Sequence, residues 1–285
     1  MMVLEIAIWI GWFVLAAFCL FWIVYAILAA GPHLWSPRDP GGDAEKGLAV
    51  WVEPIAFPAL RWGERTAARA LRRAGFGGEF VFWSWHARWR GLLVLPALMA
   101  RKRIEREAQR LADFIARRRG LQPDAPIYLL GYSCGGFVAL RALELLPEGV
   151  RVTAAALLAA VFSPRRDLVP ALSHVDGRLV VSASLMDWGI CGLGTLLFGT
   201  GGRKFTPSAG MLGVLGSERN HPKLLQLRWR PGMLPEGILG LHDWCLPAGV
   251  IARYVLPVMG IRHQSGQSVQ ATVWPDCGFC PRDRV

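Results

Sequence analysis

Apolar residues in this chain form one long run near the start and many short runs after it. The long run covers residues 6–30 and contains no charged side chain. A helix of about 20 such residues crosses the hydrocarbon core of a bilayer, so this run is long enough to span a membrane. A cleaved signal peptide would begin with basic residues and have a shorter apolar stretch, whereas Glu5 is the single charge before residue 11. We therefore expect a transmembrane anchor over residues 1–30.

The segment after the anchor is rich in residues that break regular structure. Residues 31–47 contain three prolines and a pair of glycines, which is typical of a linker. The first basic residues of the chain, Arg38 and Lys46, lie on this side of the anchor. Because positively charged flanks stay in the cytoplasm, they predict a single-pass membrane protein whose main domain faces the cytoplasm.

From residue 48 onward, short apolar runs alternate with longer amphipathic ones. Such alternation predicts βαβ units and a mostly parallel sheet flanked by helices. The expected strands are residues 48–56, 79–85, 127–131, 152–162, 178–184 and 224–229, and the expected helices are residues 60–74, 98–119, 134–146 and 247–258. We predict one α/β domain over residues 48–262 and a C-terminal tail over residues 263–285.

The helix expected at residues 98–119 has the clearest pattern. Ile104, Ala108, Leu111 and Ile115 recur at spacings of three and four, which predicts one buried stripe. Arginines crowd the other faces of this helix. They indicate either a solvated surface or an electrostatic contact with anionic lipid headgroups.

The composition shows a strong excess of basic residues. The formal net charge is +11, and the hydrophobic fraction of 53% is raised in part by the anchor. A basic excess favours anionic surfaces. Since no motif typical of RNA or DNA binding is present, we expect contact with a lipid bilayer and no nucleic-acid partner. The competing hypothesis, nucleic-acid binding through the arginine-rich helices, predicts an affinity that falls steeply with salt.

The six cysteines predict neither a disulfide framework nor a metal site. They are scattered along 285 residues, unlike those of a small disulfide scaffold. Cys277 and Cys280 form one C-x-x-C pair with no second pair and no flanking histidine. This favours a feature of the tail over half a zinc site or a redox pair. We expect no metal and no cofactor.

The motif with the clearest chemistry is G-x-S-x-G, formed by Gly131, Ser133 and Gly135. A predicted strand precedes it and a predicted helix follows it, which is the setting of a nucleophile elbow. The sharp turn lifts the serine hydroxyl clear of the sheet, and the glycines let strand and helix pass closely. The helix N-terminus also favours negative charge on a substrate oxygen. The alternative is a glycine-rich turn without chemistry.

With this motif in this setting, residues 48–260 resemble the α/β-hydrolase fold family. The resemblance implies the chain order nucleophile, acid after a late strand, and histidine before the last helix. Ser133 matches the nucleophile, and His242, just before the last predicted helix, matches the histidine. Asp187 follows the late strand and is the expected acid. Asp167, after the preceding strand, is the alternative.

The resemblance also implies two backbone N–H groups that bind the developing oxyanion. Cys134 supplies one, and Phe57 is the expected second donor because Pro58 has no N–H. The chain departs from the family here, since no His-Gly dipeptide follows the first strand. Little sequence is left for two leading antiparallel strands, which predicts about six strands in place of eight. The Cys134 thiol is expected to pack, because a cysteine nucleophile would stand at position 133.

These features favour an esterase, lipase or thioesterase that acts on a small-molecule or acyl substrate. Ser133 would attack an ester, thioester or amide carbonyl to form an acyl-enzyme, with His242 as base and Asp187 orienting the imidazole. The second hypothesis is a catalytically inactive α/β-hydrolase-like domain that serves as a membrane-tethered binding or scaffold module. The unusual loop after the first strand supports it. The sequence leaves the substrate and the oligomeric state open.

Overall fold

The computed structural model describes residues 41–53, 62–85, 101–200 and 205–261, together with scattered helical positions between Glu5 and Leu20. Six strands in these segments form one sheet in the order β2-β1-β3-β4-β5-β6, and every neighbouring pair is parallel. Their bounds are β1 Asp43–Val52, β2 Gly78–Trp83, β3 Ile127–Tyr132, β4 Ala154–Leu158, β5 Leu179–Ala183 and β6 Leu224–Arg228. The predicted α/β class and the count of six strands are confirmed over the described residues.

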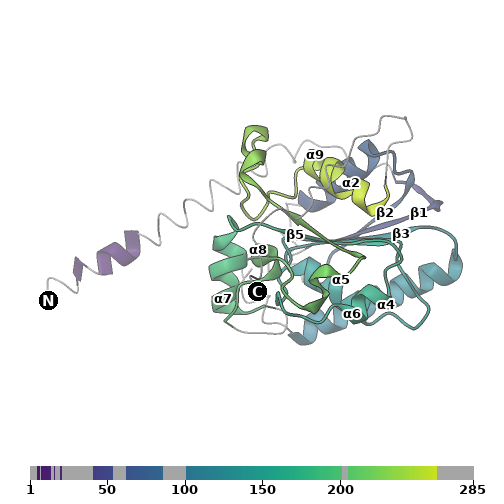
Figure 1. Ribbon diagram of the computed structural model, residues 1–285, viewed down its shortest axis with the longest axis horizontal. Helices are drawn as coiled ribbons and strands as arrows, with labels where there is room; N and C mark the ends of the chain where they lie inside the picture. The colour runs from purple at the N-terminus through teal and green to yellow at the C-terminus, as the bar shows by residue number, and fades with distance from the viewer. Residues whose placement is uncertain are drawn as a thin grey trace, which may run out of the picture.

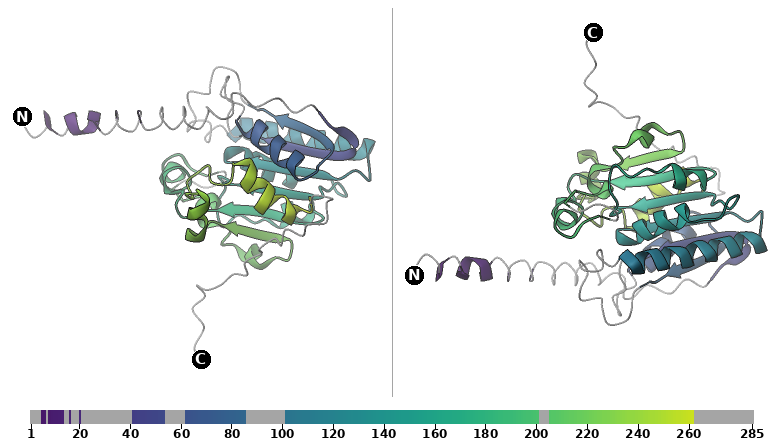
Figure 2. Two further views of the ribbon diagram at one scale, coloured as in Figure 1. Left: turned by 90° about the horizontal axis from the view of Figure 1, so that it is seen from above. Right: turned by 90° about the horizontal axis from the view of Figure 1, so that it is seen from below.

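Helices cover both faces of the sheet, with α2 and α9 over one face and α4, α5 and α6 over the other (Figures 1 and 2). The bounds are α2 Trp62–Arg73, α4 Arg101–Leu121, α5 Cys134–Glu144, α6 Val169–Ser173 and α9 Ala248–Val250, and the short helices α7 Thr195–Phe198 and α8 Ala209–Leu212 follow β5. In β1, Leu48 and Val50 pack with α4 and α5, whereas Ala49 and Trp51 pack with α2 and α9. This alternation follows from the two-residue repeat of a strand. One strand thereby contributes to two hydrophobic cores.

Helix α4 has the buried stripe that its sequence predicts. Ile104, Ala108, Leu111 and Ile115 are at most 1% exposed. Part of the arginine-rich surface of α4 bonds within the domain: Arg119 donates to the backbone carbonyls of Pro123, Ala125 and Arg151. Some of the basic charge on this helix therefore has a structural role.

The start of β1 and the form of the last helix differ from those that hydrophobicity predicts. Strand β1 begins at Asp43, ahead of the apolar run, because its polar start pairs with β2 through a shifted register. Backbone pairing of this kind leaves no hydrophobic trace in the sequence. The last helix is α9 continued by the π-helical turn Ile251–Val255 and the 3-10 turn Pro257–Met259. A proline cannot donate the backbone bond that an α-helix requires at that point.

Only part of the predicted anchor lies among the described residues. Positions 21–40 are outside them, as are residues 262–285 with Cys277 and Cys280. No helix in the part of the chain that the structure describes is long and apolar enough to cross a membrane. The anchor and the tail therefore stay predictions.

A buried carboxyl group stands directly after β1. Glu53 is 6% exposed, and Trp51 Nε1 donates a hydrogen bond of 2.7 Å to its Oε2. Trp85 Nε1 donates a hydrogen bond of 2.6 Å to the backbone carbonyl of Glu53. Burial, with a smaller contribution from the nearby Glu64, raises the pKa of Glu53 from 4.5 to about 8. The carboxyl group is therefore neutral in the folded protein at neutral pH.

Glu53→Gln is expected to make the protein less sensitive to rising pH. The unfolded chain ionises Glu53 near pH 4.5 and the folded chain near pH 8. The stability that the neutral carboxyl contributes is thus fully present below the pKa of the unfolded chain, and it is lost as the pH rises through the pKa of the folded chain. The variant should gain a few kcal/mol relative to wild type between about pH 5 and about pH 9, measured by urea unfolding. All other titrating groups are shared by the two proteins. A difference in unfolding free energy that stays constant across this pH range would therefore contradict a neutral Glu53.

Candidate active site

Ser133 occupies a strained turn between β3 and α5. Its φ of 53° and ψ of −121° lie in a region that residues other than glycine rarely adopt. Hydrogen bonds to β4 and to the segment after it hold the turn: Ser133 N–H donates to Leu158 O at 2.8 Å, and Val161 N–H donates to Ser133 O at 3.2 Å. The surrounding sheet therefore stabilises a conformation that the isolated peptide would avoid.

The glycines of the motif are required by close packing. A Cβ atom on Gly135 would overlap the Val52 carbonyl oxygen and lie 2.8 Å from the carbonyl carbon of Glu53. A Cβ on Gly131 would lie 2.7 Å from Gly135 O, and one on Gly136 would lie 2.6 Å from Ala160 Cβ. Real Cβ atoms do not approach so closely. The expectation that small residues let strand and helix pass is confirmed.

The candidate site lies at the carboxyl ends of the parallel strands. Ser133 directly follows β3, Asp187 lies in the loop after β5, and His242 lies between β6 and α9. The chain order of strands reverses between β1 and β3. In open α/β sheets this reversal leaves a crevice at the carboxyl ends, where ligands bind.

The structure brings three of the predicted side chains into one hydrogen-bonded row. His242 Nε2 is 3.0 Å from Ser133 Oγ, and His242 Nδ1 is 2.6 Å from Asp187 Oδ2. The Asp187 side chain is 1% exposed and the imidazole 17%. An ionised carboxylate only accepts, so Nδ1 carries the proton and Nε2 is left to accept from the serine hydroxyl. This arrangement can move a proton from Ser133 to the imidazole.

Asp187 is held by the helical turn that follows it, the π-helix Trp188–Gly194. Cys191 N–H donates to Asp187 Oδ1 at 3.1 Å, and Gly192 N–H donates to its backbone carbonyl at 3.1 Å. With Oδ1 bonded in this way, Oδ2 faces the imidazole. The carboxylate thus caps a helix and binds His242 at once.

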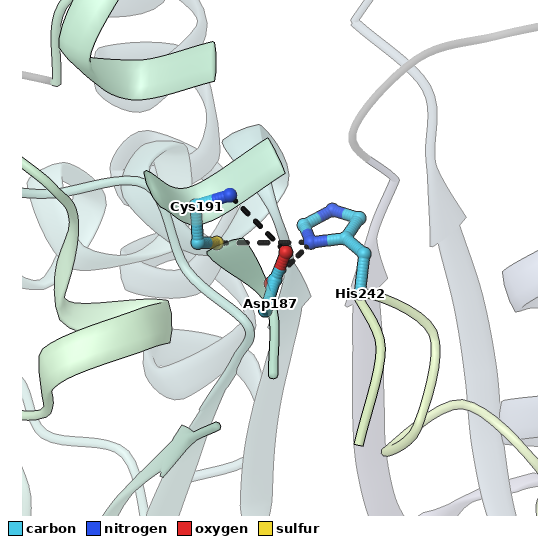
Figure 3. Close-up of side chains that lie close together, drawn as sticks. All are labelled: Asp187, Cys191 and His242. Carbon is cyan, nitrogen blue, oxygen red and sulfur yellow. Dashed lines mark hydrogen bonds and ion pairs between the residues drawn. The ribbon is translucent and has the colours of Figure 1, made fainter. Parts of the chain in front are cut away.

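Cys191 is a neighbour of the site that sequence reasoning missed. Its Sγ is 3.7 Å from His242 Nδ1 (Figure 3). The same sulfur donates to Ala159 O at 3.4 Å. The side chain is fully buried. Its spacing of four residues from Asp187, one helical turn, is the one sign of this proximity in the sequence.

Two side-chain hydrogen bonds to backbone carbonyls hold the loop that carries His242. Tyr132 OH donates to His242 O at 3.3 Å, and the two rings lie 5.1 Å apart. Ser184 Oγ donates to Gly240 O at 2.5 Å. Gly240 has a φ of 78° and packs against Trp229 so closely that a side chain there would clash. These contacts limit the positions open to the imidazole.

The alternative acid and the other histidines lie elsewhere or make other hydrogen bonds. Asp167 is exposed, and its carboxylate accepts from Val169 N–H at 2.9 Å. His174 Nδ1 is 2.8 Å from Val150 O, and His221 Nδ1 accepts from a backbone N–H. His263 is outside the described residues. Of the two acids that the sequence proposed, Asp187 is the one that His242 binds, and His242 is the histidine that contacts Ser133.

One of the two expected oxyanion donors can be described. Cys134 N–H, the first amide of α5, makes no backbone hydrogen bond with another described residue. The Cys134 thiol is 2% exposed, and burial raises its pKa to about 12, which makes it an inert packing group. Phe57 belongs to residues 54–61, outside the described part. The second donor therefore stays a prediction.

Several solved structures resemble this chain, with low sequence identity and low TM-scores. A carboxylesterase from Mesorhizobium loti is 19% identical with a TM-score of 0.41, and the match covers 73% of this chain and 87% of that one. An esterase from Pyrobaculum calidifontis is 10% identical with a TM-score of 0.37, covering 67% and 69%. An acylaminoacyl peptidase from Pyrococcus horikoshii is 14% identical with a TM-score of 0.43, covering 79% and 39%.

The sequence matches no protein-family model and no curated protein. Structural likeness at such identities and TM-scores carries no argument about activity. The fold assignment rests on the parallel sheet order, the strained serine turn between strand and helix, and the order serine, acid, histidine along the chain. The described part of this chain has an α/β-hydrolase-like fold.

Proposed function

We propose that this protein is a serine hydrolase that cleaves an ester, thioester or amide bond. The observation that carries the proposal is the unbroken row from Ser133 Oγ through both nitrogens of His242 to Asp187 Oδ2, with distances of 3.0 and 2.6 Å. Such a row supplies a nucleophile, a base and a group that orients the base. No cofactor is needed for this chemistry.

In the proposed reaction His242 takes the proton of Ser133 as Oγ attacks the substrate carbonyl. Asp187 keeps the Nδ1 tautomer and stabilises the imidazolium that forms. The Cys134 N–H, at the N-terminus of α5, binds the developing oxyanion, and we assign the second donor to Phe57. His242 then protonates the leaving group, and an activated water releases the acyl group from Ser133.

The surface beside the acid favours an apolar acyl substrate. The segment after β5 exposes large apolar side chains on both sides of Asp187: Leu185 is 63% exposed, Trp188 61% and Leu197 61%. Burying such surface against an apolar chain contributes about 25 cal/mol per Å². An acyl chain that leads away from the carbonyl bound at Ser133 could cover part of it.

Labelling with a fluorophosphonate probe tests the proposed function. The probe reacts with activated serines, so one adduct is expected on the peptide that contains Ser133, and none in Ser133→Ala. A folded wild-type protein that stays unlabelled would favour the alternative, an inactive α/β-hydrolase-like domain used as a binding or scaffold module. Labelling that persists in Ser133→Ala would place the reactive group elsewhere.

We further propose that residues 1–30 anchor the protein as a single-pass helix, with the domain on the cytoplasmic side. Residues 6–30 carry no charge. The described positions in this stretch are helical, and Trp9, Trp12 and Phe13 are 74%, 62% and 76% exposed. Exposed apolar side chains of this kind are stable in lipid but not in water.

Deleting residues 1–30 is expected to release the protein from membranes. The full chain should stay in the membrane pellet through high salt and alkaline carbonate, because a bilayer-spanning helix resists both. The truncated chain should appear in the supernatant, while Ser133→Ala remains in the pellet and controls for loss of activity. Release of the full chain by salt alone would indicate electrostatic binding in place of an anchor.

A further inference from the structure

Three potential metal ligands, Asp187, Cys191 and His242, lie close together (Figure 3). Asp187 and Cys191 approach Nδ1 of the imidazole, and the other ring nitrogen, Nε2, faces Ser133. Asp187, Cys191 and His242 each offer one ligand atom, and these atoms lie within 4.8 Å of one another. We propose that this cluster binds Zn²⁺ and that the bound ion switches the hydrolase off. The inhibitory part of the proposal rests on the proposed function, whereas the binding site itself does not.

The type of ligand favours zinc. Thiolate, imidazole and carboxylate are the three protein groups that bind Zn²⁺, and a thiolate selects it over Mg²⁺ or Ca²⁺. In the described segments this is the one group of three such side chains close enough to share an ion. The site therefore differs from a patch of surface acids, which would hold hard cations weakly.

The distances come close to those that an ion requires. A tetrahedral Zn²⁺ with bonds of about 2.0 Å to nitrogen and 2.3 Å to sulfur holds those two atoms about 3.6 Å apart. Cys191 Sγ and His242 Nδ1 are already 3.7 Å apart. His242 Nδ1 and Asp187 Oδ2, now 2.6 Å apart, must separate by less than about 1 Å. A small rotation of the partly exposed imidazole within its fixed loop would open this gap and keep Nε2 toward Ser133.

Binding would move protons in a way that blocks the base. Zn²⁺ displaces the proton of Cys191 Sγ to solvent and forms a bond to the sulfur. It also takes the place of the proton on His242 Nδ1, and a neutral imidazole then carries its proton on Nε2. Nε2 faces Ser133 Oγ at 3.0 Å and can no longer accept from it. The serine would keep its position but lose its base.

Cobalt titration tests the site directly. Co²⁺ takes the place of Zn²⁺ and gives a near-ultraviolet thiolate-to-metal band and visible bands when its geometry is tetrahedral. The full chain should carry Cys277→Ser and Cys280→Ser, because the C-x-x-C pair of the tail could bind Co²⁺ as well. We expect one Co²⁺ per chain with a thiolate band, and stoichiometric Zn²⁺ should abolish that band.

The matched variants are Cys191→Ala and Cys191→Ser against Cys245→Ser, another fully buried thiol. Both Cys191 variants should lose the cobalt band and need at least about 10-fold more Zn²⁺ for half-inhibition of ester hydrolysis. Each rate is compared with the zinc-free rate of the same variant. Cys245→Ser should keep the band and the inhibition. Thermal unfolding provides a second measurement, since Zn²⁺ should raise the Tm of wild type and not of the Cys191 variants.

The outcomes separate this proposal from the proposed function. Hydrolysis with no cobalt band, or with equal zinc inhibition in Cys191→Ala, would overturn the site and leave the hydrolase standing. A cobalt band that depends on Cys191, in a protein that hydrolyses no ester and takes no fluorophosphonate, would support the metal site and remove the hydrolase. Loss of the band in Cys245→Ser alone would place the thiolate ligand elsewhere and overturn the assignment to Cys191.

Discussion

Ser133→Ala is expected to lower kcat/KM for an activated ester by a factor of about 10⁴ to 10⁶. The methyl group removes the nucleophile, while Asp187, His242 and the α5 N-terminus keep their positions. Any remaining rate would come from oxyanion stabilisation and binding. The measurement is the release of p-nitrophenol from short-chain esters, with the Tm of each protein as the control for folding.

A second substitution tests whether the activity depends on the hydrogen-bonded row of Ser133, His242 and Asp187. Asp187→Asn preserves the shape of the side chain, but its amide favours the wrong imidazole tautomer, so kcat should fall by about 10⁴. Asp167→Asn, at the exposed alternative acid, should leave the rate within about twofold. A rate that falls with Asp167→Asn and survives in Asp187→Asn would reverse the assignment of the acid. Near-wild-type hydrolysis by Ser133→Ala would end the serine mechanism.

Gly135→Ala is expected to have the largest effect on stability. The added methyl group would overlap the carbonyl oxygen of Val52, and backbone atoms in a sheet cannot move aside as a flexible side chain can. Overpacking of this kind should cost more than about 3 kcal/mol, a large share of the roughly 5–15 kcal/mol that stabilises a domain. Urea unfolding and soluble yield measure the loss.

Gly249→Ala is the matched control for that substitution. Gly249 lies in α9, is exposed, and has open space where its Cβ would stand. Alanine should stabilise the helix there by about 0.5–1 kcal/mol. If both variants changed stability equally, the close approach of α5 to the end of β1 would not be the cause.

Local pattern was sufficient for much of the fold. The spacing of apolar residues indicates which face of a strand or helix is buried. Examples are the two-residue repeat in the strands and the stripe of Ile104, Ala108, Leu111 and Ile115. The serine turn was equally visible, because its close packing demands glycine at positions near in sequence. Both features leave a short-range pattern in the sequence, although the contacts behind them come from distant residues, so the sequence alone is enough to predict them.

Other features depend on contacts between distant parts of the chain. The polar start of β1 pairs through backbone atoms that have no hydrophobic signature. Asp187 and Asp167 both follow strands, and only the folded chain puts one carboxylate beside His242 and leaves the other in solvent. Cys191 meets that imidazole across 51 residues of sequence. Side chains on separate loops meet where the sheet brings its strand ends together, and the spacing of residues within one loop does not encode that meeting.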